Sequence, residues 1–428
     1  PLIKDRLFFF AMYEGRDVKP ENTDNLGNSM SRGESDDGFW GATLDWQITD
    51  NNLLSLMGFS NENRVDTTTY TYDFENDEVG QALSDSYSEG GGDNWALTWT
   101  SYLTDNLSMK LMHGRTERTS VSGSPNDVDC NYVSAGGGVP DAGVPLGCTN
   151  NLSIYDRTDE REQTRADFEW MLGDHLLRFG YDAETNTSDL SQGYSGPGGV
   201  SYQVSTTTPG AQIPDAGTVP AGYDAYVRAR RYELFGNFES TNKAVYVEDN
   251  WSISDNFILN LGLRYEQFDN KDAEGTTYIE MDDMIAPRVG FSWDVKGDGT
   301  TKLFGNVGRY YLPVANVINI KQGGALLDER TFYGFDGWEI LDHNGVKYAM
   351  PKLGPQFGFS NDQGDGTVGD LRAEVDHDMD PVYQDEAILG FQQQLDATWS
   401  WGVRGIYRKL HNAIDDINIT ATHCGRVA

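Results

Sequence analysis

Apolar and polar residues alternate with a period of two in many short stretches of this chain. Within residues 40–48, Leu44 and Trp46 fall on one face, while Asp45 and Gln47 fall on the other. The same alternation recurs in further segments, at residues 95–103, 166–172, 177–181 and 259–266. Successive side chains of a strand point to opposite faces, so each segment is predicted to be a β-strand with one apolar and one polar face.

The connections between the predicted strands alternate between short and long. Tight turns are predicted at residues 49–52, 104–106, 173–175, 254–256, 296–300 and 396–398. Long polar loops are predicted near residues 15–36, 61–92, 118–160, 186–230, 269–282 and 313–380. In an outer-membrane barrel, one rim bears tight turns and the other bears extended external loops, whereas a β-sandwich gives no reason for this difference.

These patterns predict an all-β chain that forms a transmembrane antiparallel up-and-down β-barrel. The segments number about thirteen, and bacterial barrels close with even numbers, so the chain is expected to supply part of a larger barrel. Tryptophans lie near the predicted strand ends, where an interfacial aromatic girdle is expected. They are Trp40, Trp46, Trp95, Trp170, Trp251, Trp293, Trp399 and Trp401.

A lipid environment fixes which side chains point outward, because polar groups in hydrocarbon are costly. The residues expected to point outward are Leu44, Trp46, Leu97, Trp99, Phe168, Trp170, Phe179, Leu261, Leu263, Val289 and Phe291. Those expected to point inward are Asp45, Gln47, Asp167, Glu169, Asn260, Arg264 and Arg288.

Composition and the absence of known catalytic motifs limit the classes of function that the chain can have. The 428 residues carry a formal charge of -35, from 32 basic and 67 acidic residues. Nucleic-acid binding needs a clustered basic surface, so nucleic acid is excluded as a partner. The sequence contains no Gly-x-Ser-x-Gly elbow, no His-Glu-x-x-His motif and no phosphate loop, and we therefore expect no enzyme activity.

Cysteines and acidic clusters are the remaining candidates for site chemistry. Cys130 and Cys148 flank a segment rich in Gly and Pro, which predicts a disulfide across one external loop and leaves Cys424 unpaired. Loop carboxylates offer weak calcium candidates, without the spacing of an EF-hand, at Asp362, Asp365, Asp376 and Asp378. Solvated loop charge is the simpler interpretation, and no other cofactor is expected.

Several motifs follow one another along the chain: the opening PLIKDRLFFF, VYVEDNW at 245–251, LNLGLRYE at 259–266, APRVGF at 286–291, GNVGRYY at 305–311, ILGFQ at 388–392 and Tyr407-Arg408. These motifs, in this order, resemble those of TonB-dependent receptors of the Oar-like branch. The resemblance runs from residue 1 to about residue 416.

This resemblance implies a 22-stranded barrel in the bacterial outer membrane, with an N-terminal plug and a short segment that contacts the TonB complex. Residues 1–428 are then expected to be a partial barrel, from which the plug and the final strands are absent. The implied partners are outer-membrane lipid and lipopolysaccharide, the TonB complex through the plug region, and a transported substrate of unknown identity.

Within such a barrel, charged residues on the inner faces of the strands are candidate lumen-facing residues. They are Arg264, Glu266, Arg288, Asp294 and Arg404. The first strand is an exception to the alternation, because both of its faces are apolar. One of its two apolar sets must face inward, either Phe8, Phe10 and Met12 or Leu7, Phe9, Ala11 and Tyr13, and we expect that inward set to pack on the plug.

Three functions fit these observations. The first is a receptor that passes a substrate through a plugged barrel, using energy supplied by TonB. A surface adhesin or structural barrel that binds ligands through its external loops, without transport, is the alternative. The third, a barrel-borne hydrolase of the omptin kind, requires paired acidic and histidine groups above a smaller closed barrel. A plug with a TonB segment would favour the first.

Overall fold

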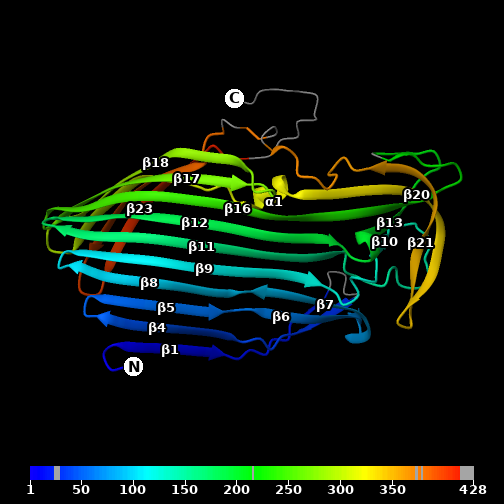
Figure 1. Ribbon diagram of the computed structural model, residues 1–428, viewed down its shortest axis with the longest axis horizontal. Coiled ribbons are helices and arrows are strands. Elements are labelled where there is room, and N and C mark those ends of the chain that lie inside the picture. The colour runs from blue at the N-terminus through cyan, green and yellow to red at the C-terminus, as the bar shows by residue number, and fades with distance from the viewer. Residues whose placement is uncertain (24–28, 215, 372–374, 377–378, 415–428) are drawn as a thin grey trace.

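The computed structural model describes residues 1–23, 29–214, 216–371, 375–376 and 379–414 (Figure 1). Strands dominate these residues, as the alternation predicts. The described helical elements are α1 (Asn316–Gly323) and the short 3₁₀ turn η1 (Pro197–Gly199). Within the described ranges, no helix is both long enough and apolar enough to cross a bilayer.

Thirteen of the described strands form one antiparallel wall, in which each strand pairs with the next along the chain. They are β1 (Leu7–Glu14), β4 (Phe39–Thr49), β5 (Asn52–Ser60), β8 (Asp93–Thr104), β9 (Leu107–Gly123), β11 (Ser153–Leu172), β12 (His175–Tyr194), β16 (Ala225–Ser254), β17 (Phe257–Lys271), β18 (Thr277–Asp294), β19 (Thr301–Tyr311), β22 (Tyr383–Gln394) and β23 (Ser400–His411). The predicted up-and-down topology is confirmed.

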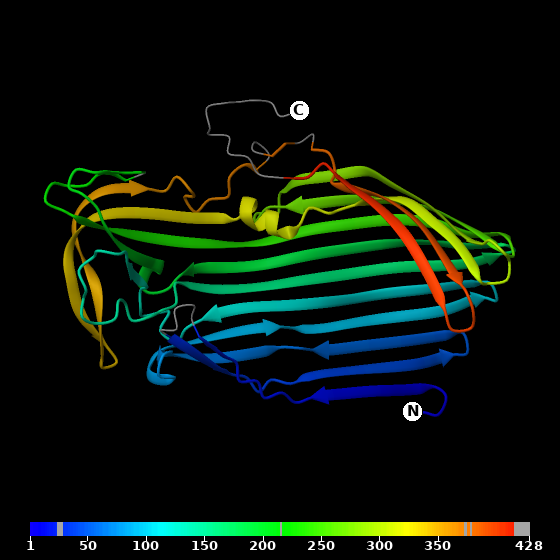
Figure 2. The same cartoon turned by 180° about the vertical axis from the view of Figure 1, so that it is seen from behind.

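The six predicted tight turns all lie at one end of this wall, which we call the turn rim; the opposite end is the loop rim. In Figure 2, β19, β22 and β23 pass in front of the other strands, so the sheet is curved, and α1 lies on the concave side. Among the described residues, β1 pairs only with β4 and β23 only with β22.

The connections at the loop rim contain more strand than the sequence predicted. They hold β2 (Glu21–Thr23), β3 (Ser29–Glu34), β6 (Asn63–Asp73), β7 (Glu78–Gly91), β10 (Val133–Ala135), β13 (Val200–Thr206), β14 (Gln212–Ile213), β15 (Gly217–Thr218), β20 (Ala325–His343) and β21 (Val346–Ser360). The loop predicted near residues 269–282 was wrong, because only residues 272–276 separate β17 from β18. Thr- and Tyr-rich stretches such as β6 pair readily once a neighbouring strand offers free backbone groups.

The longest strand, β16, shows how far the sheet reaches beyond a membrane. Its 30 residues exceed the roughly 9 to 11 that a strand needs to cross a bilayer. The half near the turn rim pairs with β12 and β17, and the half near the loop rim pairs with β13 and β20. We call this second half and its partners the extension.

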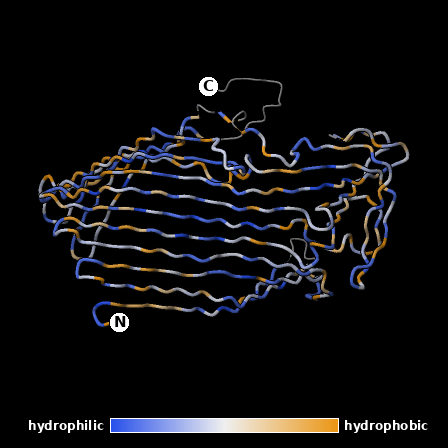
Figure 3. The backbone as a smooth tube through the Cα atoms, viewed as in Figure 1, coloured by the Kyte–Doolittle hydropathy of each residue, from blue (hydrophilic) through white to orange (hydrophobic). Residues whose placement is uncertain are grey.

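The register gives the wall two different faces. Direct cross-strand pairs such as Trp46↔Leu54, Leu54↔Trp99 and Phe179↔Val247 place all the residues expected to point outward on one face, which we call the apolar face. The residues expected to point inward share the opposite, polar face. Figure 3 shows that hydrophobic positions concentrate in the part of the wall nearest the turn rim.

Aromatic and charged residues mark the borders of the apolar face. Tryptophans follow one another close to the turn rim, at Trp46, Trp99, Trp170, Trp251, Trp293 and Trp401. The contact between Nδ1 of His175 and the carboxylate of Asp249, at 2.8 Å, lies at this border. The contact between Nε2 of His113 and the carboxylate of Glu162, at 3.3 Å, lies toward the loop rim. An apolar band between an aromatic belt and charged groups is the arrangement that a bilayer requires.

Candidate functional site

The polar face of β11 carries a row of charged side chains. Arg157, Asp159, Arg161, Arg165 and Asp167 occupy every second position, apart from a glutamine at 163, and therefore share this face. Arg157 contacts Asp159 at 2.7 Å, and Arg165 contacts Asp167 at 2.9 Å. The row runs along the concave side of the wall and gives it a hydrophilic lining.

The charged lining continues on neighbouring strands. Arg161 of β11 pairs with Glu184 of β12. The hydroxyl group of Tyr246 on β16 donates a hydrogen bond to Asp167, at 2.5 Å. The lining is therefore a network that crosses several strands.

The register places all five predicted lumen-facing residues on this polar face. Arg264 forms ion pairs with Glu266 and, at 3.5 Å, with Asp182. Arg288 stacks over the ring of Tyr310, at 4.5 Å. Asp294 accepts a hydrogen bond from the backbone N–H of Gly299 in a tight turn, at 2.7 Å. Arg404 is exposed on β23.

A cavity of about 810 Å³ opens on the wall between its middle and the loop rim. Polar and charged side chains of β9, β11, β12 and β16 form most of its lining, together with the segment that precedes α1. The residues include Arg118, Arg157, Arg161, Glu184, Asn186, Asn242 and Asn316. Paired charges and amides offer donors and acceptors to a polar solute.

Helix α1 is held against the polar face by buried amides. Asn319, which is fully buried, accepts hydrogen bonds from the hydroxyl of Tyr278 at 2.6 Å and from Nδ2 of Asn270 at 2.9 Å. Asn316 donates a hydrogen bond to Oγ of Ser188 at 2.8 Å. Burial raises the pKa of Tyr278 above its usual value, so this phenol stays a donor. The helix therefore forms a fixed part of the wall near the cavity.

Cys130 and Cys148 form a disulfide within the connection between β9 and β11, with their Cα atoms 5.2 Å apart. That separation fits the limit of about 7 Å for a bridged pair. The enclosed loop extends the edge of β21 through a bridge between Leu146 and Ala349. The N–H of Gly147 donates to the carbonyl of Ala349 at 3.0 Å, and the N–H of Ala349 donates to the carbonyl of Pro145 at 2.8 Å. Cys424 lies outside the described residues.

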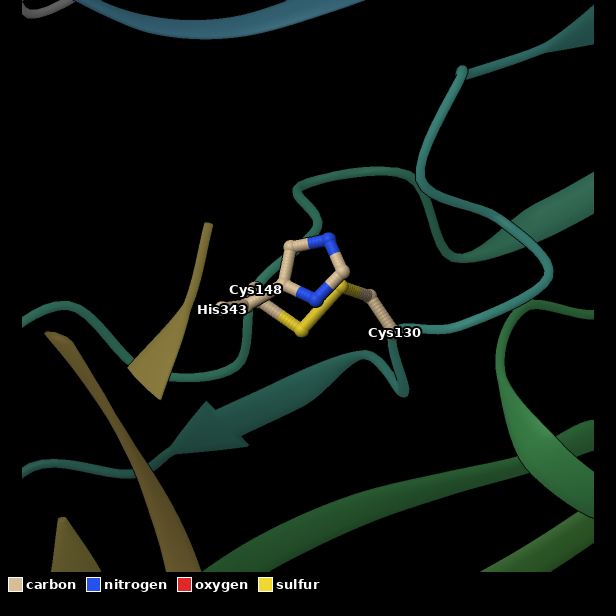
Figure 4. Close-up of side chains that lie close together, drawn as sticks. All are labelled: Cys130, Cys148 and His343. Carbon is tan, nitrogen blue, oxygen red and sulfur yellow. A yellow bond between two sulfur atoms is a disulfide. The ribbon is translucent and has the colours of Figure 1, made fainter. Parts of the chain in front are cut away.

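His343, from the tip of the β20–β21 hairpin, lies against this disulfide (Figure 4). Its ring nitrogen and the two sulfur atoms lie within 4.8 Å of one another. A cysteine binds a metal through its thiolate, and here the two sulfur atoms are bonded to each other in a disulfide. The contact therefore joins two long connections at the loop rim.

The calcium candidates do not converge among the described residues. Asp365 accepts hydrogen bonds from the backbone and hydroxyl of Thr367, and Asp362 accepts one from Ser360 at 3.2 Å. No group of three acidic residues with converging oxygens occurs in the ranges that the structure describes. Asp378 lies outside those ranges, and calcium binding stays a prediction.

Two features of the polar face were not predicted. The amides that fix α1 lie in a segment without helical periodicity, so no sequence pattern indicated them. An arginine cluster in the extension, Arg228, Arg230 and Arg330, was also missed. The basic run RARRY at 228–232 is its one visible signal in this acidic chain.

A curved antiparallel wall with an apolar outer face, an aromatic belt and a charged inner face defines an outer-membrane β-barrel protein. The chain belongs to the outer membrane beta barrel domain family, whose model matches residues 18–278. It is 26% identical over 300 residues to the TonB-dependent transporter Oar of Myxococcus xanthus, a match that covers 62% of this chain and 27% of Oar. The bacterial outer membrane is therefore its location, as predicted.

A solved structure agrees with this fold. The outer membrane transporter YddB from Escherichia coli matches 94% of this chain with a TM-score of 0.53 and 14% sequence identity. The chain spans 47% of YddB, so it corresponds to about half of that protein or less. The predicted relation to TonB-dependent receptors is confirmed at the level of the barrel family, and the count of 22 strands stays a prediction.

Proposed function

We propose that this chain forms part of the wall of an outer-membrane receptor that admits a polar substrate along its inner face, with energy supplied through TonB. The observation that supports this most is the polar face, which carries paired charges from the turn rim to the 810 Å³ cavity near the loop rim. The relatives are named as transporters, which agrees with this role. We propose no catalytic activity.

The partners follow from the two faces. The apolar face contacts outer-membrane lipid, and lipopolysaccharide lies beside it on the side of the loop rim, because long loops of such barrels face outward. Phe8, Phe10 and Met12 are each more than 40% exposed on the polar side of β1, where they would pack on a plug. The TonB complex would act through that plug.

The alternative is an adhesin that captures a ligand without passing it on. The extension favours it, because β13, β16, β20 and β21 carry the sheet well beyond a bilayer and the disulfide fixes the loop beside them. Both functions use the same outer surface. They differ in whether the ligand crosses the membrane.

Uptake separates the two. We expect cells that express the protein from its own gene to accumulate at least one solute from a panel of labelled peptides, oligosaccharides and metal chelates. Cells without TonB should not accumulate that solute. Asn186→Trp, which fills the cavity, should lower uptake several-fold. Thr185→Trp, on the opposite face of β12, should not. Solutes that bind these cells but never enter would contradict transport and support the adhesin.

A further inference from the structure

Three arginines gather on the polar face of the extension, on β16 and its neighbour β20. Arg230 of β16 lies directly opposite Arg330 of β20, and Arg228 lies two positions farther along the same face. One carboxylate, that of Asp328, accompanies them. A local excess of positive charge is unusual in a chain whose formal charge is -35.

Asp328 shows how two of these guanidinium groups bind a carboxylate. Its oxygens accept two hydrogen bonds from Arg230, both at 2.7 Å, and two from Arg330, at 2.7 and 3.2 Å. The Asp328 side chain is only 3% exposed. A planar pair of oxygens therefore fits this part of the sheet in the bidentate geometry that arginine favours.

Arg228 has no such partner among the described residues. Its Nε atom is buried without a hydrogen-bond acceptor, and none of the described ion pairs involves this side chain. Burial, together with repulsion from Arg230 and Arg330, lowers the pKa of Arg228. An arginine nevertheless stays charged at any physiological pH, so its guanidinium retains an uncompensated charge.

Aromatic rings flank the cluster on both sides. Arg230 lies over the rings of Tyr194 and Tyr232, at 5.6 and 5.2 Å. Beyond Arg228, Tyr226, Phe332 and Phe357 pack with ring centroids 6.2 to 6.3 Å apart. These rings reduce hydration around the guanidinium groups, which strengthens a charge-assisted hydrogen bond to an anion.

We propose that Arg228, Arg230 and Arg330, held in place by Asp328, form a binding site for the carboxylate or phosphate group of a solute. The site lies on the concave face, between the loop rim and the cavity. It extends the proposed function by naming anionic solutes as the substrate class. It depends on that function only in so far as the bound anion is then transported.

Direct binding to the purified, lipid-reconstituted protein tests the site without any uptake. The probes are benzene-1,3,5-tricarboxylate and inorganic phosphate, measured by calorimetry, with a neutral sugar as the blank. We expect saturable binding of at least one anion, weakened as KCl is raised. We expect Arg228→Gln to weaken it at least tenfold, and Arg228→Lys, which keeps the charge and the fold, to weaken it less.

Arg231→Gln is the matched control. Arg231 follows on the same strand but lies on the opposite face, where it pairs with Glu233 at 2.8 Å and with Glu329 at 3.8 Å. Its replacement should leave anion affinity within about twofold. Equal affinities for the two glutamine variants, or no saturable binding of either anion, would overturn the site. Binding without uptake would leave the site intact and contradict only the transport function.

Discussion

Replacement of Phe238 by alanine is expected to release α1 from the polar face, with a loss of local stability of about 3–5 kcal/mol. The Phe238 side chain is fully buried and packs with Leu190 of β12 and Ile320 of α1. Gly236 makes room for this ring, since a Cβ there would approach its Cζ atom to 2.6 Å. Because the site is closely packed, the cavity left by the ring cannot collapse fully.

Hydrogen exchange of the α1 amides measures this effect, since opening of the helix need not unfold the wall. Phe235→Ala is the matched control, because Phe235 lies on the same strand but on the opposite face and is 52% exposed. Its replacement should change the free energy of opening of α1, derived from hydrogen exchange, by less than about 0.5 kcal/mol. Equal protection of α1 in the two variants would contradict the assigned packing.

Replacement of Leu263 by arginine is expected to destabilise assembly in a bilayer by about 2–4 kcal/mol, because a charged group then faces hydrocarbon near the midplane. Leu263 is 47% exposed on the apolar face, midway between the end of β17 at the turn rim and its end toward the loop rim. Leu261→Arg should destabilise assembly to a similar extent. The fraction of heat-modifiable, folded protein recovered in vesicles measures the effect.

Asn260→Arg tests the same strand on its other face. Asn260 lies opposite Asn250 and Gly290 on the polar face, where water solvates a new charge. Assembly of this variant should resemble that of the unaltered protein. Equal tolerance of arginine at residues 260 and 263 would mean that lipid does not cover the apolar face.

The wall could be predicted from the sequence because each of its hairpins is local. The alternation sets the two faces, and turns such as residues 173–175 fix the pairing of adjacent segments such as β11 and β12. The added strands could not be predicted in the same way. β16 pairs with β20 across about a hundred intervening residues, and no local pattern specifies that partner.

The candidate site likewise contains residues that local alternation could place and residues that only long-range pairing brings together. Parity along a strand was enough to place Arg264 and Glu266 on the polar face. The cluster of Arg228, Arg230 and Arg330 depends on the β16–β20 register, and the contact between Arg230 and Asp328 spans 98 residues. Asn319 was missed because the contacts that stabilise α1 come from other elements rather than from its own sequence periodicity.

Accessibility of spin labels along β16 tests most directly that lipid covers one face of this wall and water the other. Single cysteines at residues 244–250, placed in a variant without the native cysteines, are labelled and reconstituted in vesicles. Labels at Val245 and Val247 should collide with oxygen, and those at Tyr246 and Glu248 with a water-soluble nickel chelate, in a period of two. Uniform access of the nickel chelate to both faces would mean that lipid does not cover the apolar face.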